Sequence, residues 1–291
     1  MSLPPEILKK VKMLELNTRK LVQNVFAGQY QTAFRGQGMT FADFREYVPG
    51  DDVRNISWAL MARTDKVYLK KFDEEREMTL MLAVDVSGSA DFGTGKYFKG
   101  EVITHLAACL GFAASKNNDH VGLVLFSDQI EHYVPPRKGR GHVQRILRDL
   151  YYYQPKSRRT RIASGLEYLQ GVLKKRAHIF LCSDFMDQGY DAALRLLGKK
   201  HDVVAIVVSD PAENILPDIG VVDLHDAETG EIVTVDTSSR AFRSHYEKHV
   251  RQQGSERDRL LKQSQVDRID VVSSENFVDP LIAYFQKRKR R

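Results

Sequence analysis

The chain has 291 residues, 42% of them hydrophobic and 28% charged, which is typical of a soluble globular protein with a full core. Its apolar stretches are short and interrupted by charge, so we expect neither a membrane-spanning helix nor a signal peptide in the charged N-terminal segment. The net charge of +6 comes largely from QKRKRR at the C-terminus, which we interpret as a solvated tail, and no aromatic and basic stripe elsewhere predicts a nucleic-acid partner.

The N-terminal part of the chain is predicted to form a helix and a small β-containing cap. Apolar residues from Ile7 to Leu21 recur at helical spacing, which indicates an amphipathic helix over residues 3–25. The segment that follows is rich in glycine, turn residues and charge, and within it KVYLKKF (66–72) predicts a strand at a sheet edge. We therefore expect a first domain over residues 1–75.

From residue 76 onward, buried strands alternate with helices. Strands are expected over residues 79–86, 120–127, 130–135, 177–184, 201–210 and 268–274. Helices are expected over residues 97–116, 141–152, 162–175, 190–200, 238–264 and 276–288, and a hairpin that turns at Glu228–Gly230 is expected over 221–236. Strands that are buried on both faces and separated by helices predict an α/β domain with a doubly wound, mostly parallel sheet, over residues 76–291.

The sequence lacks the motifs of several classes of catalytic and metal-binding site. The nine histidines are scattered and form neither an HExxH motif nor a paired metal spacing. No Gly-x-Ser-x-Gly elbow or P-loop occurs. Cys109 and Cys182 lie inside apolar runs and form no CxxC pair, so we expect two buried thiols in a reducing compartment, the cytoplasm.

A candidate metal site begins at DVSGS, residues 85–89, which places a carboxylate and two hydroxyls at alternate positions after a buried strand. Asp184 follows another strand and Thr160 precedes a helix, so all of them should meet at the edge where doubly wound sheets bind ligands. Such oxygen donors suit a hard cation, Mg²⁺ or otherwise Mn²⁺ or Ca²⁺. The predicted ligands are Asp85, Ser87, Ser89, Thr160 and Asp184, with one position left open for a partner's carboxylate. The alternative is that the serines cap and shape a turn, with Asp85 serving the next helix terminus.

Two parts of the sequence resemble known families. DVSGS, Thr160 and Asp184, in this strand–helix order, resemble the metal-ion-dependent adhesion site (MIDAS) of von Willebrand factor A domains, over residues 76–288. The block from Arg45 to Glu75 resembles the bacterial domain-of-unknown-function family 58, whose members carry an A-type domain after it. The residues that carry this second resemblance include Arg45, Glu46, Tyr47, Asp51, Asp52, Arg54, Trp58 and Arg63.

The resemblance implies a von Willebrand A-like sheet flanked by helices, with a small N-terminal helix and β cap, and a non-enzymatic function in metal-dependent protein binding. Family members commonly accompany MoxR-type AAA+ ATPases, so the implied partner is such an ATPase or its client, in a chaperone-like or complex-maturation role. One departure from the A-domain pattern is SRR before Thr160, where glycine is usual. Arg158 and Arg159 would bring positive charge close to the cation.

Two other functions stay open. One is a Mg²⁺-dependent phosphohydrolase, although haloacid-dehalogenase chemistry needs an aspartate where this chain has Ser87. The other is a metal-free scaffold that docks through the Arg45–Arg63 block. That block is expected to form either a buried hydrogen-bonded network or a partner surface anchored by Arg, Tyr and Trp.

Overall fold

The computed structural model describes Met13, Tyr30, Ala33 and residues 39–64, 66–74 and 78–289. The chain divides into two compact units, residues 34–77 and the remainder. The helix expected over 3–25 lies outside the described residues, apart from Met13, which is helical. Tyr30 belongs to the large unit, where its hydroxyl donates to Asp119 at 3.2 Å and its ring meets the edge of Phe285.

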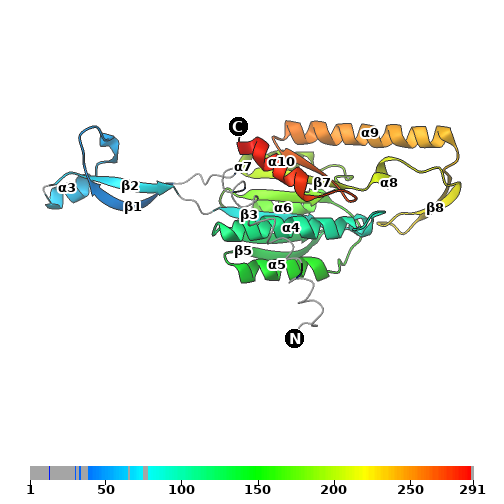
Figure 1. The fold of residues 1–291 in the computed structure, drawn as a ribbon, viewed down its shortest axis with the longest axis horizontal. Helices are drawn as coiled ribbons and strands as arrows, with labels where there is room; N and C mark the ends of the chain where they lie inside the picture. The colour runs from blue at the N-terminus through cyan, green and yellow to red at the C-terminus, as the bar shows by residue number, and fades with distance from the viewer. Residues whose placement is uncertain are drawn as a thin grey trace, which may run out of the picture. The chain divides into compact units, whose positions relative to one another are not determined.

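The small unit is an antiparallel hairpin with two short helices in its connection (Figure 1). Strand β1 (Met39–Glu46) pairs with β2 (Tyr68–Glu74), and η2 (Val53–Asn55) and α3 (Trp58–Thr64) lie between them. The strand predicted over 66–72 corresponds to β2. The sequence does not predict β1, because a register shift between Phe41 and Asp43 interrupts the period-two pattern by which a strand is found.

The large unit is built on a six-stranded sheet in the order β10-β7-β6-β3-β4-β5. All neighbours are parallel except β5, which is antiparallel to β4. The strands are β3 (Thr79–Asp85), β4 (His120–Phe126), β5 (Ile130–Arg137), β6 (His178–Ser183), β7 (Asp202–Ser209) and β10 (Asp267–Val272). This order confirms the predicted von Willebrand A-like, doubly wound and mostly parallel sheet.

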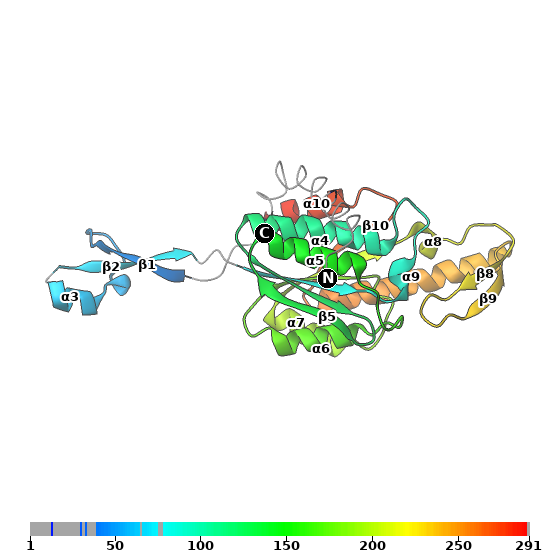
Figure 2. The same cartoon turned by 90° about the horizontal axis from the view of Figure 1, so that it is seen from below.

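Helices cover both faces of this sheet (Figure 2). One face carries α4 (Lys99–Lys116), α5 (Arg140–Tyr152) and α10 (Val278–Lys289), and the other carries α6 (Ile162–Val172), α7 (Asp191–Lys200) and α9 (Arg240–Gln263). Because helices pack on both faces, the central strands are buried almost throughout, and so are Cys109 and Cys182, as predicted. Among the described residues, no helix is both long enough and apolar enough to cross a membrane.

A second hairpin, predicted from the sequence, lies beyond the carboxyl end of the sheet. It consists of β8 (Val221–His225) and β9 (Ile232–Asp236), and it follows the short helix α8 (Pro211–Asn214). Gly230 closes its turn with φ +76°, a conformation that favours glycine. Most of the strand residues are exposed, including Val221 and Ile232 at 69% and 64%. The hairpin is therefore not part of the core.

Candidate functional site

Asp85 ends β3 at the carboxyl edge of the sheet and is only 3% exposed. Both of its carboxylate oxygens accept hydrogen bonds, one from the Ser87 N–H at 3.0 Å and one from the Ser183 hydroxyl at 2.8 Å. Burial and then the nearby negative charge of Asp184 raise the pKa of Asp85 to about 6, in spite of these hydrogen bonds. The fold thus holds a buried carboxylate in one orientation and next to a like charge.

The Ser87 and Ser89 hydroxyls lie 3.3 Å apart on the turn that follows β3. Ser87 precedes η3 (Gly88–Asp91), but its side chain makes no capping hydrogen bond there. Asp85 shapes this turn because it accepts the N–H of Ser87, which precedes η3. The Ser87 hydroxyl does not cap η3, contrary to the alternative in which the serines act as caps.

The loop that carries Thr160 lies directly beside this turn. The Gly88 N–H donates to the carbonyl oxygen of Arg158 at 2.8 Å, which joins the two segments predicted to form the site. Glu131 anchors the loop from β5 by accepting the N–H groups of Lys156 and Ser157, each at 3.1 Å. The structure thus brings together two segments that are about 70 residues apart in the sequence.

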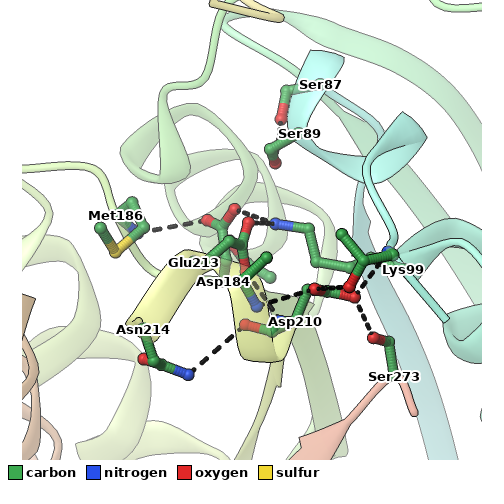
Figure 3. A network of polar contacts seen from close by, with 12 residues as sticks. Ser87, Ser89, Lys99, Asp184, Met186, Asp210, Glu213, Asn214 and Ser273 are labelled. Atoms are coloured by element: carbon green, nitrogen blue, oxygen red, sulfur yellow. Dashed lines mark hydrogen bonds and ion pairs between the residues drawn. The ribbon is translucent and has the colours of Figure 1, made fainter. Parts of the chain in front are cut away.

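Asp184, the fifth predicted ligand, follows β6 and is bound to Lys99, a residue that we did not predict as part of the site. The ammonium of Lys99 lies 3.0 Å from Asp184 Oδ2 and 2.5 Å from Glu213 Oε1, and its side chain is only 3% exposed. Figure 3 shows Lys99 reaching these two carboxylates, with Ser87 and Ser89 on the neighbouring turn. Burial alone would lower the pKa of Lys99, but the two carboxylates raise it, so this ammonium stays charged.

Lys99 was detectable from the sequence, although we did not predict its role. It is the first residue of α4, and a cation is unfavourable there because the helix dipole is positive at that end. A buried lysine at that position requires carboxylates nearby. Arg158 and Arg159, expected to supply positive charge at the site, have exposed side chains, whereas the cation that contacts Asp184 is Lys99.

A neighbouring carboxylate, Asp210, fixes the segments around this network. It accepts hydrogen bonds from the Thr94 and Ser273 hydroxyls, both at 2.5 Å, and from the Ala212 N–H at 3.0 Å. Burial would raise the pKa of Asp210, but these hydrogen bonds outweigh it and lower the pKa to about 2. Asp210 is therefore ionised and fully bonded, and we assign it a positioning role, not that of a ligand.

The donors that meet at this edge fit a hard cation by their chemistry. No group of three or more His, Cys, Asp or Glu side chains that would hold a metal occurs in the part of the chain that the structure describes. A cation would therefore need the hydroxyls of Ser87, Ser89 and Thr160 besides Asp85 and Asp184, as in the predicted set. The raised pKa of Asp85 is consistent with the fit, because burial and then the charge of Asp184 make its ionised form costly and a cation would offset that cost.

In the small unit, the Arg45–Arg63 block forms ion pairs at the surface. Arg45 pairs with Asp51 through two hydrogen bonds of 2.8 and 2.7 Å, and Arg54 pairs with Asp52. The Arg54 side chain is 86% exposed and Trp58 is 67% exposed. The interpretation of this block as a buried network is therefore wrong for Arg54 and Trp58.

Comparisons with known proteins agree with this fold. The chain matches the family described as "Protein of unknown function DUF58" over residues 43–256. It is 32% identical over 231 residues to an uncharacterized protein of Mycobacterium tuberculosis (strain ATCC 25618 / H37Rv), which covers 78% of this chain and 73% of that protein.

The chain is also similar to solved structures of low sequence identity. An aerotolerance-related membrane protein from Bacteroides fragilis NCTC 9343 is 16% identical and aligns with a TM-score of 0.50 over 73% of this chain and 98% of that chain, which supports the fold alone. The SpRpn10 VWA domain is 12% identical, with a TM-score of 0.40 over 70% of this chain and 94% of its own. The family match and the mycobacterial relative bear out the resemblance found in the sequence, and the chain belongs to the DUF58 family.

Proposed function

We propose that this DUF58 protein is a cytoplasmic, non-enzymatic adaptor that binds protein partners through a divalent cation at the carboxyl edge of its sheet. The cation would be Mg²⁺, with Mn²⁺ or Ca²⁺ as alternatives, and its ligands would be Asp85, Ser87, Ser89, Thr160 and Asp184. The observation that carries the proposal is the buried Asp85, which lies beside Asp184 and is followed by the paired hydroxyls of Ser87 and Ser89, on a turn that is hydrogen-bonded to the loop of Thr160.

The residues around the site have distinct roles in this proposal. The Ser87 N–H and the Ser183 hydroxyl orient Asp85, and Lys99 holds Asp184 while it offsets part of the negative charge. When bound, the cation supplies a positive centre that can accept a carboxylate from the partner. Because three of its five ligands would be neutral hydroxyls, the cation would stay electrophilic enough to accept that carboxylate.

For the partner, we propose a MoxR-type AAA+ ATPase or its client, and membership of the DUF58 family supports this choice. The test is capture of the purified MoxR-type ATPase of the same organism, with Mg²⁺ and with EDTA, by the parent protein and by Ser89→Ala. Ser255→Ala, on the exposed surface of α9, is the matched control. We expect the parent and Ser255→Ala to capture the ATPase with Mg²⁺ but not with EDTA, and Ser89→Ala to capture it in neither condition. Equal capture in EDTA would contradict the proposal, and a phosphatase assay of the parent tests the non-enzymatic part.

A second candidate is a metal-free scaffold that docks through the small unit. It is favoured by the exposure of Trp58, at 67%, and of Val48 and Val53, both at 58%. Large apolar side chains of this kind, next to Arg54, are common anchors of protein interfaces. In this case Trp58→Ala abolishes capture of the same ATPase in Mg²⁺ and in EDTA, whereas Ser89→Ala binds like the parent.

A further inference from the structure

A carboxylate of this chain is hydrogen-bonded to one of the proposed cation ligands. Glu228, at the tip of the β8–β9 hairpin, accepts the Thr160 hydroxyl at 2.5 Å and the Thr160 N–H at 3.2 Å. Both residues are partly buried. Because Thr160 is 68 positions away in the sequence, this contact depends on the hairpin folding back onto the edge of the sheet.

The turn of the hairpin is built to present this side chain. Asp226 accepts the Glu228 N–H at 2.9 Å and the Thr229 hydroxyl at 2.7 Å, and its carbonyl oxygen accepts the Gly230 N–H at 2.9 Å. The hydrogen bonds from Thr229 and then from Glu228 lower the pKa of Asp226, so the bonds are made to an ionised carboxylate. The backbone that carries Glu228 is thus fixed by its own turn.

The hairpin tip also touches the DVSGS turn. A Cβ atom added to Gly88 would lie 2.2 Å from the carbonyl oxygen of Ala227, which is far inside van der Waals contact. Glycine is therefore required at position 88 for the tip to lie where it does. Two separate contacts, at Gly88 and at Thr160, place the tip over the two loops that supply the hydroxyl ligands.

Between its ends the hairpin has little support. At its base, the Thr237 N–H donates to the Gly220 carbonyl oxygen at 2.8 Å, and Arg243 pairs with Asp218 at 3.0 Å. All but two of the ten strand residues are exposed. An element held mainly at its base and tip can release the tip without disturbing the core.

We infer that Glu228 is an internal ligand of the cation site, which occupies the place of the partner's carboxylate until a partner displaces the hairpin tip. The inference rests on the proposed function, since it takes the cation ligands from there. It assigns Glu228 two opposite effects. Glu228 strengthens cation binding, because it adds a carboxylate beside Thr160, and it weakens partner binding, because both carboxylates compete for one position.

The test compares the parent with Glu228→Gln and with Glu231→Gln, which removes the same charge from an exposed position on the same hairpin. Mn²⁺ is the probe, and its dissociation constant is measured from the electron paramagnetic resonance signal of unbound Mn²⁺. We expect Glu228→Gln to weaken Mn²⁺ binding about tenfold and Glu231→Gln to leave it unchanged. At saturating Mn²⁺, Glu228→Gln should capture the MoxR-type ATPase several-fold better than the parent. A merely structural role for Glu228 would lower both.

The outcomes separate this inference from the proposed function. If the parent binds Mn²⁺ and Glu228→Gln binds it equally well, the internal ligand is refuted and the cation site stands. If the parent binds no Mn²⁺, the cation site is refuted and the internal ligand with it. If Glu228→Gln binds Mn²⁺ more weakly and also captures less ATPase, Glu228 supports the site without competing for it, and the inference is overturned.

Discussion

Replacing Asp85 with asparagine should stabilise the metal-free protein, although Asp85 is buried and hydrogen-bonded. Burial and the charge of Asp184 raise the pKa of Asp85 from 3.8 to about 6. Near pH 7.5 the folded protein must keep this carboxyl ionised at a cost of about 3 kcal/mol, since the shift of about two pKa units corresponds to about 1.4 kcal/mol per unit. A neutral amide avoids this cost.

The hydrogen bonds around Asp85 allow the substitution. The amide oxygen of asparagine can accept the Ser87 N–H, and its NH₂ group can donate to the Ser183 hydroxyl oxygen. The Ser183 hydroxyl oxygen would then accept two hydrogen bonds, because it also accepts the Phe185 N–H at 3.1 Å. The Ser183 hydroxyl proton loses its acceptor, because the NH₂ group replaces the Asp85 oxygen that it bound, and this loss costs about 1 kcal/mol. The net gain is about 2 kcal/mol, which corresponds to a rise in melting temperature of roughly 4–8 °C for a domain of this size.

The assay is thermal unfolding in EDTA near pH 7.5 and near pH 4.5, followed by circular dichroism. Because the pKa of Asp85 is raised, its destabilising effect is absent below the unfolded pKa of about 4 and complete above about 6, so the advantage of Asp85→Asn should shrink at the lower pH. Asp191→Asn, an exposed carboxylate in the first turn of α7, should instead lose about 0.5 kcal/mol as a control. An Asp85→Asn protein that melts at or below the parent temperature near pH 7.5 would refute the reasoning.

Three further substitutions test other parts of the site. Lys99→Met leaves the two carboxylates it contacts uncompensated and should lower the free energy of unfolding in EDTA by about 3–5 kcal/mol, as measured with urea; a loss under about 1 kcal/mol contradicts the buried ion pair. Glu131→Gln should cost about 2 kcal/mol near pH 7 by the same measurement. Burial would raise the pKa of Glu131, but hydrogen bonds from Lys156 and other donors lower it to about 2, so this stabilisation is present above about pH 4 and should vanish as the pH falls toward 2. Gly88→Ala collides with the Ala227 carbonyl oxygen and should displace the hairpin tip, which amide hydrogen exchange of residues 226–231 would detect as faster exchange than in the parent.

Most of the fold was predictable because its signals are local. Each buried strand of the large unit is a short apolar run, and nearly every helix boundary lies within three residues of its prediction. The exceptions are elements without a periodic pattern. β1 has a register shift in the middle of its pairing, and the seven residues of α3 and four of α8 are too few to show helical periodicity.

The site was predictable only where a motif names its residues. Asp85 and Asp184 lie near each other because β3 and β6 are parallel neighbours that end at the same edge, and the loop of Thr160 adjoins DVSGS through the hydrogen bond from Gly88 to Arg158. Glu228 was predicted as part of a turn, but nothing local indicates which surface the tip of a hairpin will touch. Its contact with Thr160 is set by the path of the chain after β7, which periodicity does not report.

The charge balance at the edge of the sheet depends on Lys99, which belongs to none of the sequence motifs. Asp85, Asp184 and Glu213 contribute three negative charges near neutral pH, and Lys99 offsets one of them. A divalent cation would offset the negative charge that remains, and Lys99→Met leaves one more negative charge for the cation to offset. An ion that binds only the folded protein stabilises it more as its affinity rises. Lys99→Met should therefore destabilise the metal-free protein most and also show the largest rise in melting temperature when Mg²⁺ is added. If Mg²⁺ raises the melting temperature of Lys99→Met no more than that of the parent, Lys99 and the cation do not offset the same charge.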